Sequence, residues 1–133
     1  MIEWSDSLSL GIESIDDQHR KLVNMINALQ EAIDQAETDQ VLIDIFDGLA
    51  VYTDKHFSYE EQLFEAHGYH EHEAHQREHK VLRDQVLTLK RRFESGELLV
   101  TDALMEFLVN WLEEHIQGSD RQYVEFLKNH GVQ

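Results

Sequence analysis

Six side chains that can bind transition metals interrupt apolar helix faces in this sequence: His19, His56, Glu60, His75, His79 and His115. Each lies three or four residues from apolar neighbours, so each faces the predicted core. Burying this many imidazole and carboxylate groups costs free energy unless they share partners. The pattern therefore indicates a metal site.

The spacing within the set supports this interpretation. His56 and Glu60 are four residues apart, as are His75 and His79, and this spacing puts both members of a pair on one helical face. Asp120 follows His115 by five residues, so on a regular helix its side chain would point away from the imidazole. We expect the backbone to loosen near Gly118 so that Asp120 becomes the seventh member.

The elements that must position these residues are helices, because apolar residues recur at helical spacing and the chain has no proline. Ser14 is the predicted N-cap of the first helix, with Asp17 at its third position, and Thr38 is the predicted N-cap of the second. Gly68 suits a left-handed helix end. The predicted helices run from Ile15 to Ile33, from Thr38 to Gly68, from Tyr69 to Gly96, from after Thr101 to Gly118, and, as a short fifth piece, from Arg121 to Lys128.

Short connections between long helices favour antiparallel neighbours, so we predict an all-α fold: an up-down-up-down four-helix bundle in one domain, residues 1–133. The first dozen residues, including Trp4, Leu8 and Leu10, are expected to form an arm packed across the bundle. In this topology the start of the first and third helices lies beside the end of the second and fourth. All the candidate ligands therefore converge on one level of the core.

Five histidines and two carboxylates exceed the four positions of a zinc site, and the absence of thiolate ligands suits a pair of iron or manganese ions. If both carboxylates and a solvent oxygen bridge two octahedral ions, one coordination position stays open for a small ligand. That position lies on the ion with fewer histidines.

The sequence resembles the hemerythrin family in four features. These are His19, the motif His56-Phe57-x-x-Glu60, the His75/His79 pair, and the motif Trp111-Leu112-x-x-His115-Ile116-x-x-x-Asp120. The length and the opening Ile2-Glu3-Trp4 are similar to those of single-domain bacterial hemerythrins. The resemblance implies a non-haem di-iron site, Fe2+ or Fe3+ with an oxo or hydroxo bridge, that binds O2 reversibly. It implies that His75, His79 and His115 hold one iron, that His19 and His56 hold the other, and that Glu60 and Asp120 bridge them.

Five apolar residues close to the ligands are expected to wall a dry pocket for O2, while also serving as core: Leu22, Phe57, Trp111, Leu112 and Ile116. Tyr123 lies three residues beyond Asp120 and is a candidate hydrogen-bond donor near the bridge.

We interpret the protein as an O2 carrier, store or delivery protein and not an enzyme. The alternatives are a stand-alone O2 or redox sensor, or a di-iron oxidase or peroxide- or NO-handling protein. The Glu-x-x-His pairs of the ferritin-like di-iron sites do not occur in this sequence, which disfavours an oxygenase.

Composition excludes several partners. The net charge of -16 would repel nucleic acid and anionic membranes, and the lack of cysteine excludes disulfides and thiolate chemistry. No basic and apolar leader or long apolar run is present, so we expect a cytoplasmic protein without membrane insertion. Whether a separate protein receives the O2 stays an open question.

Four histidines lie outside the predicted site. We expect His67 to be a cation that favours a helix end, and His70, His72 and His130 to be solvated. His70 and His72 have a spacing that suits a stray divalent ion, but we predict no site there.

Overall fold

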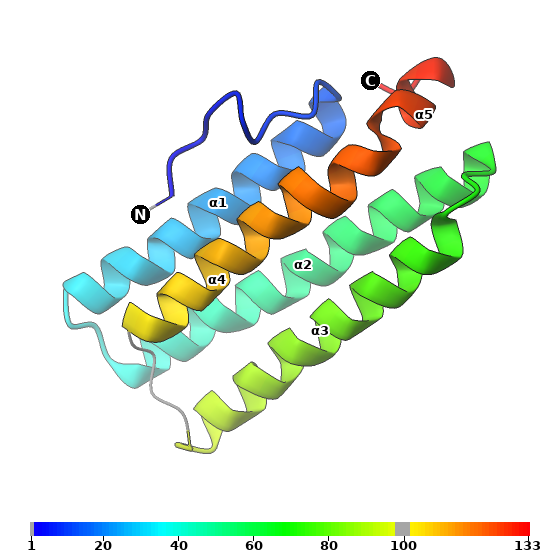
Figure 1. Ribbon diagram of the computed structural model, residues 1–133. Coiled ribbons are helices and arrows are strands. Elements are labelled where there is room, and N and C mark those ends of the chain that lie inside the picture. Colours follow the sequence, from blue (N-terminus) through cyan, green and yellow to red (C-terminus); the bar gives the residue numbers. More distant parts are fainter. Residues whose placement is uncertain (1, 98–101) are drawn as a thin grey trace.

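The computed structural model describes residues 2–97 and 102–133, without the side chains of Asp102 and Ala103. Four long helical segments make up most of the chain (Figure 1). Their bounds are Glu13–Asp34 (α1), Asp39–His67 (α2), His72–Glu94 (α3) and Asp102–Glu114 (α4), and α4 continues through His115–Ser119 and Asp120–Tyr123 into α5, Val124–Asn129.

Successive helices run antiparallel, and the N-terminal segment lies along the outside of α1 (Figure 1). The predicted up-down-up-down four-helix bundle with an arm and a short C-terminal helix is therefore confirmed. The start of α1, the end of α2, the start of α3 and the end of the α4 segment share one end of the bundle (Figure 1).

Two of the predicted helix-end signals are confirmed. The Thr38 side chain accepts a hydrogen bond from the Val41 amide at 3.3 Å, and Gly68 ends α2 in the left-handed region with a φ of +72°. The start of the third helix differs from the prediction, because α3 begins at His72 and Tyr69 lies in the turn before it. The Tyr69 ring is buried there and packs against Phe64.

The predicted cap at Ser14 is wrong. The N-cap of α1 is Ile12, which makes no side-chain cap bond, and Ser14 lies inside the first turn. The arm supplies the reason. Asp16 accepts hydrogen bonds from the amide of Leu10 at 2.8 Å and from the hydroxyl of Ser9 at 2.7 Å, so a carboxylate that holds the arm replaces a local cap.

The fourth helix also ends differently from the prediction, because its α-helical part stops at Glu114 rather than at Gly118. His115–Ser119 form a π-helical turn, and Asp120–Tyr123 form a 3-10 turn. A π turn takes up an extra residue relative to an α turn, which brings side chains five positions apart onto one face. This is the backbone loosening expected near Gly118.

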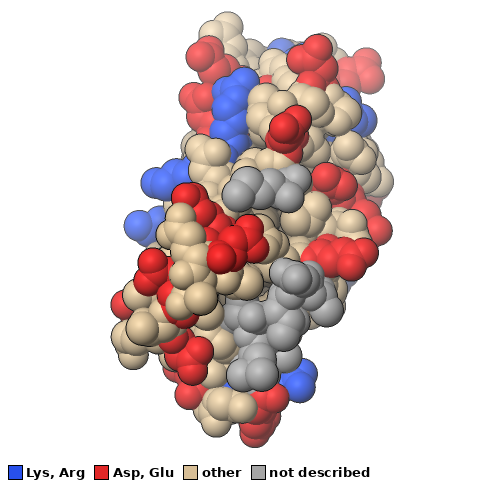
Figure 2. Space-filling model, turned by 90° about the vertical axis from the view of Figure 1, so that its left-hand side faces the viewer, with Lys and Arg blue, Asp and Glu red and all other residues tan. Residues whose placement is uncertain are grey.

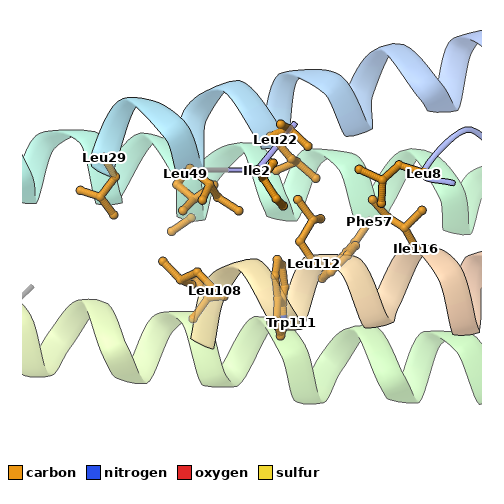
Figure 3. Close-up of a cluster of buried hydrophobic side chains, with 14 of the residues drawn as sticks. Ile2, Leu8, Leu22, Leu29, Leu49, Phe57, Leu108, Trp111, Leu112 and Ile116 are labelled. Atoms are coloured by element: carbon orange, nitrogen blue, oxygen red, sulfur yellow. The ribbon is translucent and has the colours of Figure 1, made fainter. Parts of the chain in front are cut away.

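The core holds apolar side chains from all four helices and from the arm, including Ile2 and Leu8 (Figure 3). Acidic side chains outnumber basic ones on the face shown in Figure 2, in keeping with the net charge of -16. None of the helices in the described part of the chain is long and apolar enough to cross a membrane.

Candidate metal centre

The structure brings all seven predicted side chains together at one end of the bundle. Their donor atoms form two groups, and within each group the atoms all lie within 4.8 Å of one another. One group is Glu60, His75, His79, His115 and Asp120, and the other is His19, His56, Glu60 and Asp120. Three histidines thus face one position and two face the other, with both carboxylates common to the two groups.

Glu60 presents a different oxygen to each group. Its Oε1 contacts Nε2 of His56 directly and lies 3.8 Å from Nε2 of His19, whereas its Oε2 lies 3.6 Å from Nε2 of His75 and 3.7 Å from Nε2 of His79. A carboxylate in this orientation can span two cations.

Asp120 has the same arrangement from the opposite side of the core. Its Oδ2 lies 3.1 Å from Nε2 of His19, and its Oδ1 lies 3.1 Å from Nε2 of both His75 and His115. The π-helical turn makes this possible, since it places Asp120 over His115.

The site contains many buried polar atoms without a hydrogen-bond partner among the described residues. They include both ring nitrogens of His19 and His79, Nε2 of His56 and His115, both oxygens of Glu60, and Oδ2 of Asp120. Native proteins rarely leave such groups unpaired, because each loses its bonds to water on burial. Imidazole nitrogens and carboxylate oxygens gathered in this way fit two first-row transition ions.

Three polar residues beside the ligands were not foreseen from the sequence. Gln18 Oε1 accepts a hydrogen bond from Nδ1 of His56 at 2.7 Å, and Glu78 Oε1 accepts one from Nδ1 of His115 at 3.3 Å and contacts the Ser119 hydroxyl. Glu61 Oε2 lies 3.8 Å from Nδ1 of His79. The two hydrogen bonds orient His56 and His115 so that Nε2 faces the centre.

A signal for these residues was present in the sequence. Gln18, Glu61 and Glu78 each sit next to a predicted ligand along the chain, and each reaches a ligand on a neighbouring helix.

The pKa shifts divide the histidines of the site into two kinds. Burial alone would lower the pKa of His19 and His75, but the nearby carboxylates of Asp120 and Glu60 outweigh it and raise both to about 9. The same balance, led among the raising effects by the charge of Asp120, raises the pKa of His115 to about 10.

Burial lowers the pKa of His79 to about 3. The pKa of Asp120 is lowered because the nearby imidazoles outweigh burial and the charge of Glu60, and the pKa of Glu60 is lowered well below its usual value in the same way. Before metal binds, His19, His75 and His115 would therefore be imidazolium groups beside the two carboxylates at neutral pH.

The five predicted pocket residues are all buried. Leu22, Phe57, Leu112 and Ile116 point into the space between the helices, and Trp111 lies toward α3 (Figure 3). The Phe57 ring stacks on His79 with centroids 4.0 Å apart, so it borders the three-histidine group.

A surface hollow of about 590 Å³ reaches the same three-histidine side, between α3 and α4. Trp111, His115, Glu78 and Ser119 are among its lining residues.

Tyr123 is fully buried, with its ring 5.5 Å from that of His75. Burial and the charges of Asp120 and Glu60 raise its pKa well above the usual value, so the phenol keeps its proton. Its hydroxyl makes no hydrogen bond to the described residues by distance and angle, but Glu60 lies close enough to contribute to the raised pKa, so a bond near the bridge stays a prediction.

The four-helix bundle and its two groups of histidine and carboxylate donors are together typical of a cation-binding helical-bundle protein. Residues 10–127 match the family model described as Hemerythrin HHE cation binding domain, and the chain belongs to the hemerythrin family. It is 37% identical to a bacteriohemerythrin of Stenotrophomonas maltophilia, over 98% of this chain and 84% of the relative. It is 30% identical to a bacteriohemerythrin of Clostridium acetobutylicum, over 94% of this chain and 100% of the relative.

A crystal structure of wild-type hemerythrin superimposes with a TM-score of 0.89 at 27% identity, covering 96% of this chain and 98% of that one. The similarity therefore extends over nearly the whole bundle, including the end that carries the seven side chains.

Proposed function

We propose that this protein binds O2 reversibly at a non-haem di-iron centre and acts as an O2 carrier, store or delivery protein built as one hemerythrin domain. The observation that carries the proposal is the pair of unequal donor groups that share Glu60 and Asp120. One ion with three histidines and one with two leave the second ion short of a ligand, which suits the binding of one small molecule.

In this proposal His75, His79 and His115 hold one iron and His19 and His56 hold the other, with Glu60 and Asp120 spanning the pair. The separate orientation of the two oxygens of each carboxylate supports this assignment. When bound, the iron pair supplies the electrons that reversible O2 binding requires.

Apart from His115, which lines the surface hollow, the proposed ligands are shielded from solvent by buried side chains. Leu22, Leu112 and Ile116 are buried apolar groups that offer no hydrogen bond to an organic substrate, and Phe57 covers the face of His79. Gln18 and Glu78 hold two of the imidazoles in the required orientation. Such a site favours binding a small apolar gas over transforming a larger substrate, so we propose a binding role rather than an enzymatic one.

The test is to load metal-free protein with Fe(II) under argon, admit O2, and then remove it while recording the visible spectrum. A band that appears with O2 and disappears on its removal over repeated cycles supports the proposal. Irreversible oxidation on the first exposure would instead favour an oxidase or a redox sensor.

Two variants sharpen this test. His79→Ala removes a proposed ligand and is expected to abolish the band. His70→Ala alters a histidine at the surface and is expected to leave the band intact. The reverse pattern would refute the ligand assignment.

A further inference from the structure

Two histidines outside the metal centre lie together at the surface of the same end of the bundle. The ring centroids of His67 and His130 are 5.7 Å apart. Ring pairs within the three-histidine group, which we propose to share one ion, span the same range, from 4.5 Å for His75 and His79 to 5.9 Å for His75 and His115. The separation of His67 and His130 is therefore one at which two imidazoles can bind the same ion.

Hydrogen bonding prepares His130 for this role. Its Nδ1 lies 2.8 Å from the carbonyl oxygen of Phe126 and donates to it, because a carbonyl can only accept. In the neutral imidazole this leaves the lone pair on Nε2, where a metal ion can bind. Histidines that bind a metal through one ring nitrogen commonly donate a hydrogen bond from the other to a backbone carbonyl. The Phe126 ring, with its centroid 4.2 Å from that of His130, restricts the imidazole further.

The two histidines come from different elements. His67 is the last residue of α2, and His130 follows α5. His67 is half-buried and His130 is exposed, so an ion can reach both from solvent. The net charge of -16 raises the local concentration of divalent cations around the protein.

Aromatic rings separate this pair from the candidate metal centre. The ring of Phe64 lies between His75 and Tyr69, with centroid distances of 4.9 Å and 5.1 Å, and Tyr69 in turn lies 5.0 Å from Phe126. The surface histidines therefore share no ligand with the buried groups.

We propose that His67 and His130 form a surface site for one late first-row divalent ion, Cu2+ or Zn2+, completed by water. Imidazole ligands favour these ions over Mg2+ and Ca2+, which prefer oxygen. A bound ion would tie the segment after α5 to the end of α2.

Equilibrium dialysis of the full chain against micromolar free Zn2+ tests this site. The His67→Asn and His130→Asn variants are each expected to bind one Zn2+ fewer per chain than the parent protein. Because the result is a difference between variants, it holds whatever number of ions the buried groups take up, and it stands or falls separately from O2 binding.

The matched control is His72→Asn, which removes another partly exposed histidine outside the pair and is expected to leave the Zn2+ count unchanged. The proposal is overturned if either variant of the pair binds as many ions as the parent protein, or if the control variant loses an ion as well.

Discussion

Metal binding to this protein is expected to release about three protons per chain at neutral pH. The pKa values of His19 and His75 are raised to about 9, and that of His115 to about 10, so all three imidazoles are charged before metal enters. A metal ion binds only the neutral imidazole. Since one pKa unit corresponds to about 1.4 kcal/mol, removing a proton at pH 7 from a group with a pKa near 9 costs roughly 3 kcal/mol.

Calorimetric titration with Fe(II) under argon, in two buffers with different heats of ionisation, gives the number of protons released. We expect three or more near pH 7, because a hydroxide bridge formed from water would add to the three imidazolium protons. The apparent affinity is expected to rise with pH until the imidazoles are neutral. Release of one proton or none would show that the carboxylates do not hold the histidines in the charged form.

The same raised pKa values set the pH dependence of the metal-free fold. A histidine whose pKa is higher in the folded than in the unfolded state stabilises the fold fully below about pH 6.5 and loses that contribution as pH rises through the folded value. The free energy of unfolding of the metal-free protein should therefore fall between about pH 7 and about pH 10, and urea denaturation at a series of pH values measures this. A constant value over that window would contradict the assigned charge states.

Three further predictions concern packing, backbone and ligand orientation. Phe57→Ala should lower the free energy of unfolding of metal-free protein by about 3 to 5 kcal/mol in urea denaturation, while Phe107→Ala, at an exposed position, should cost under about 1 kcal/mol; equal effects would contradict the packing. Deleting Gln117 should turn the π turn into a regular α turn that keeps Asp120 facing the centre, so iron content should not change; loss of one iron would show that the wider turn itself is required. Glu78→Ala, which removes the acceptor of the His115 hydrogen bond, should weaken iron binding by about 10- to 100-fold in chelator competition, and an unchanged affinity would rule out its role in orienting the imidazole.

Much of this architecture was predictable because polar side chains sat at helical spacing on apolar faces. His56 and Glu60 share a face by their separation alone, and the antiparallel order of the helices then determines which residues share a level. Only the resemblance to hemerythrins divided the seven residues between two ions, and the two donor groups follow the same division. That these side chains hold iron stays a prediction.

What could not be predicted depends on contacts that reach outside a single helix. Ser14 has the sequence features of a cap, but the arm reaches Asp16 and makes a local cap unnecessary. The contact of Glu78 with His115 and the approach of His67 to His130 likewise join residues from separate elements, which periodicity along one helix does not reveal.

Seven side chains are expected to hold two metal ions, with both carboxylates shared between the ions. The most direct measurement is the iron content of protein loaded with Fe(II) under argon and then freed of loose metal, for the parent chain and for Asp120→Ala. The parent chain is expected to hold two irons, and the variant fewer than two, since Asp120 faces both groups. One iron in the parent protein, or two retained in the variant, would contradict the claim.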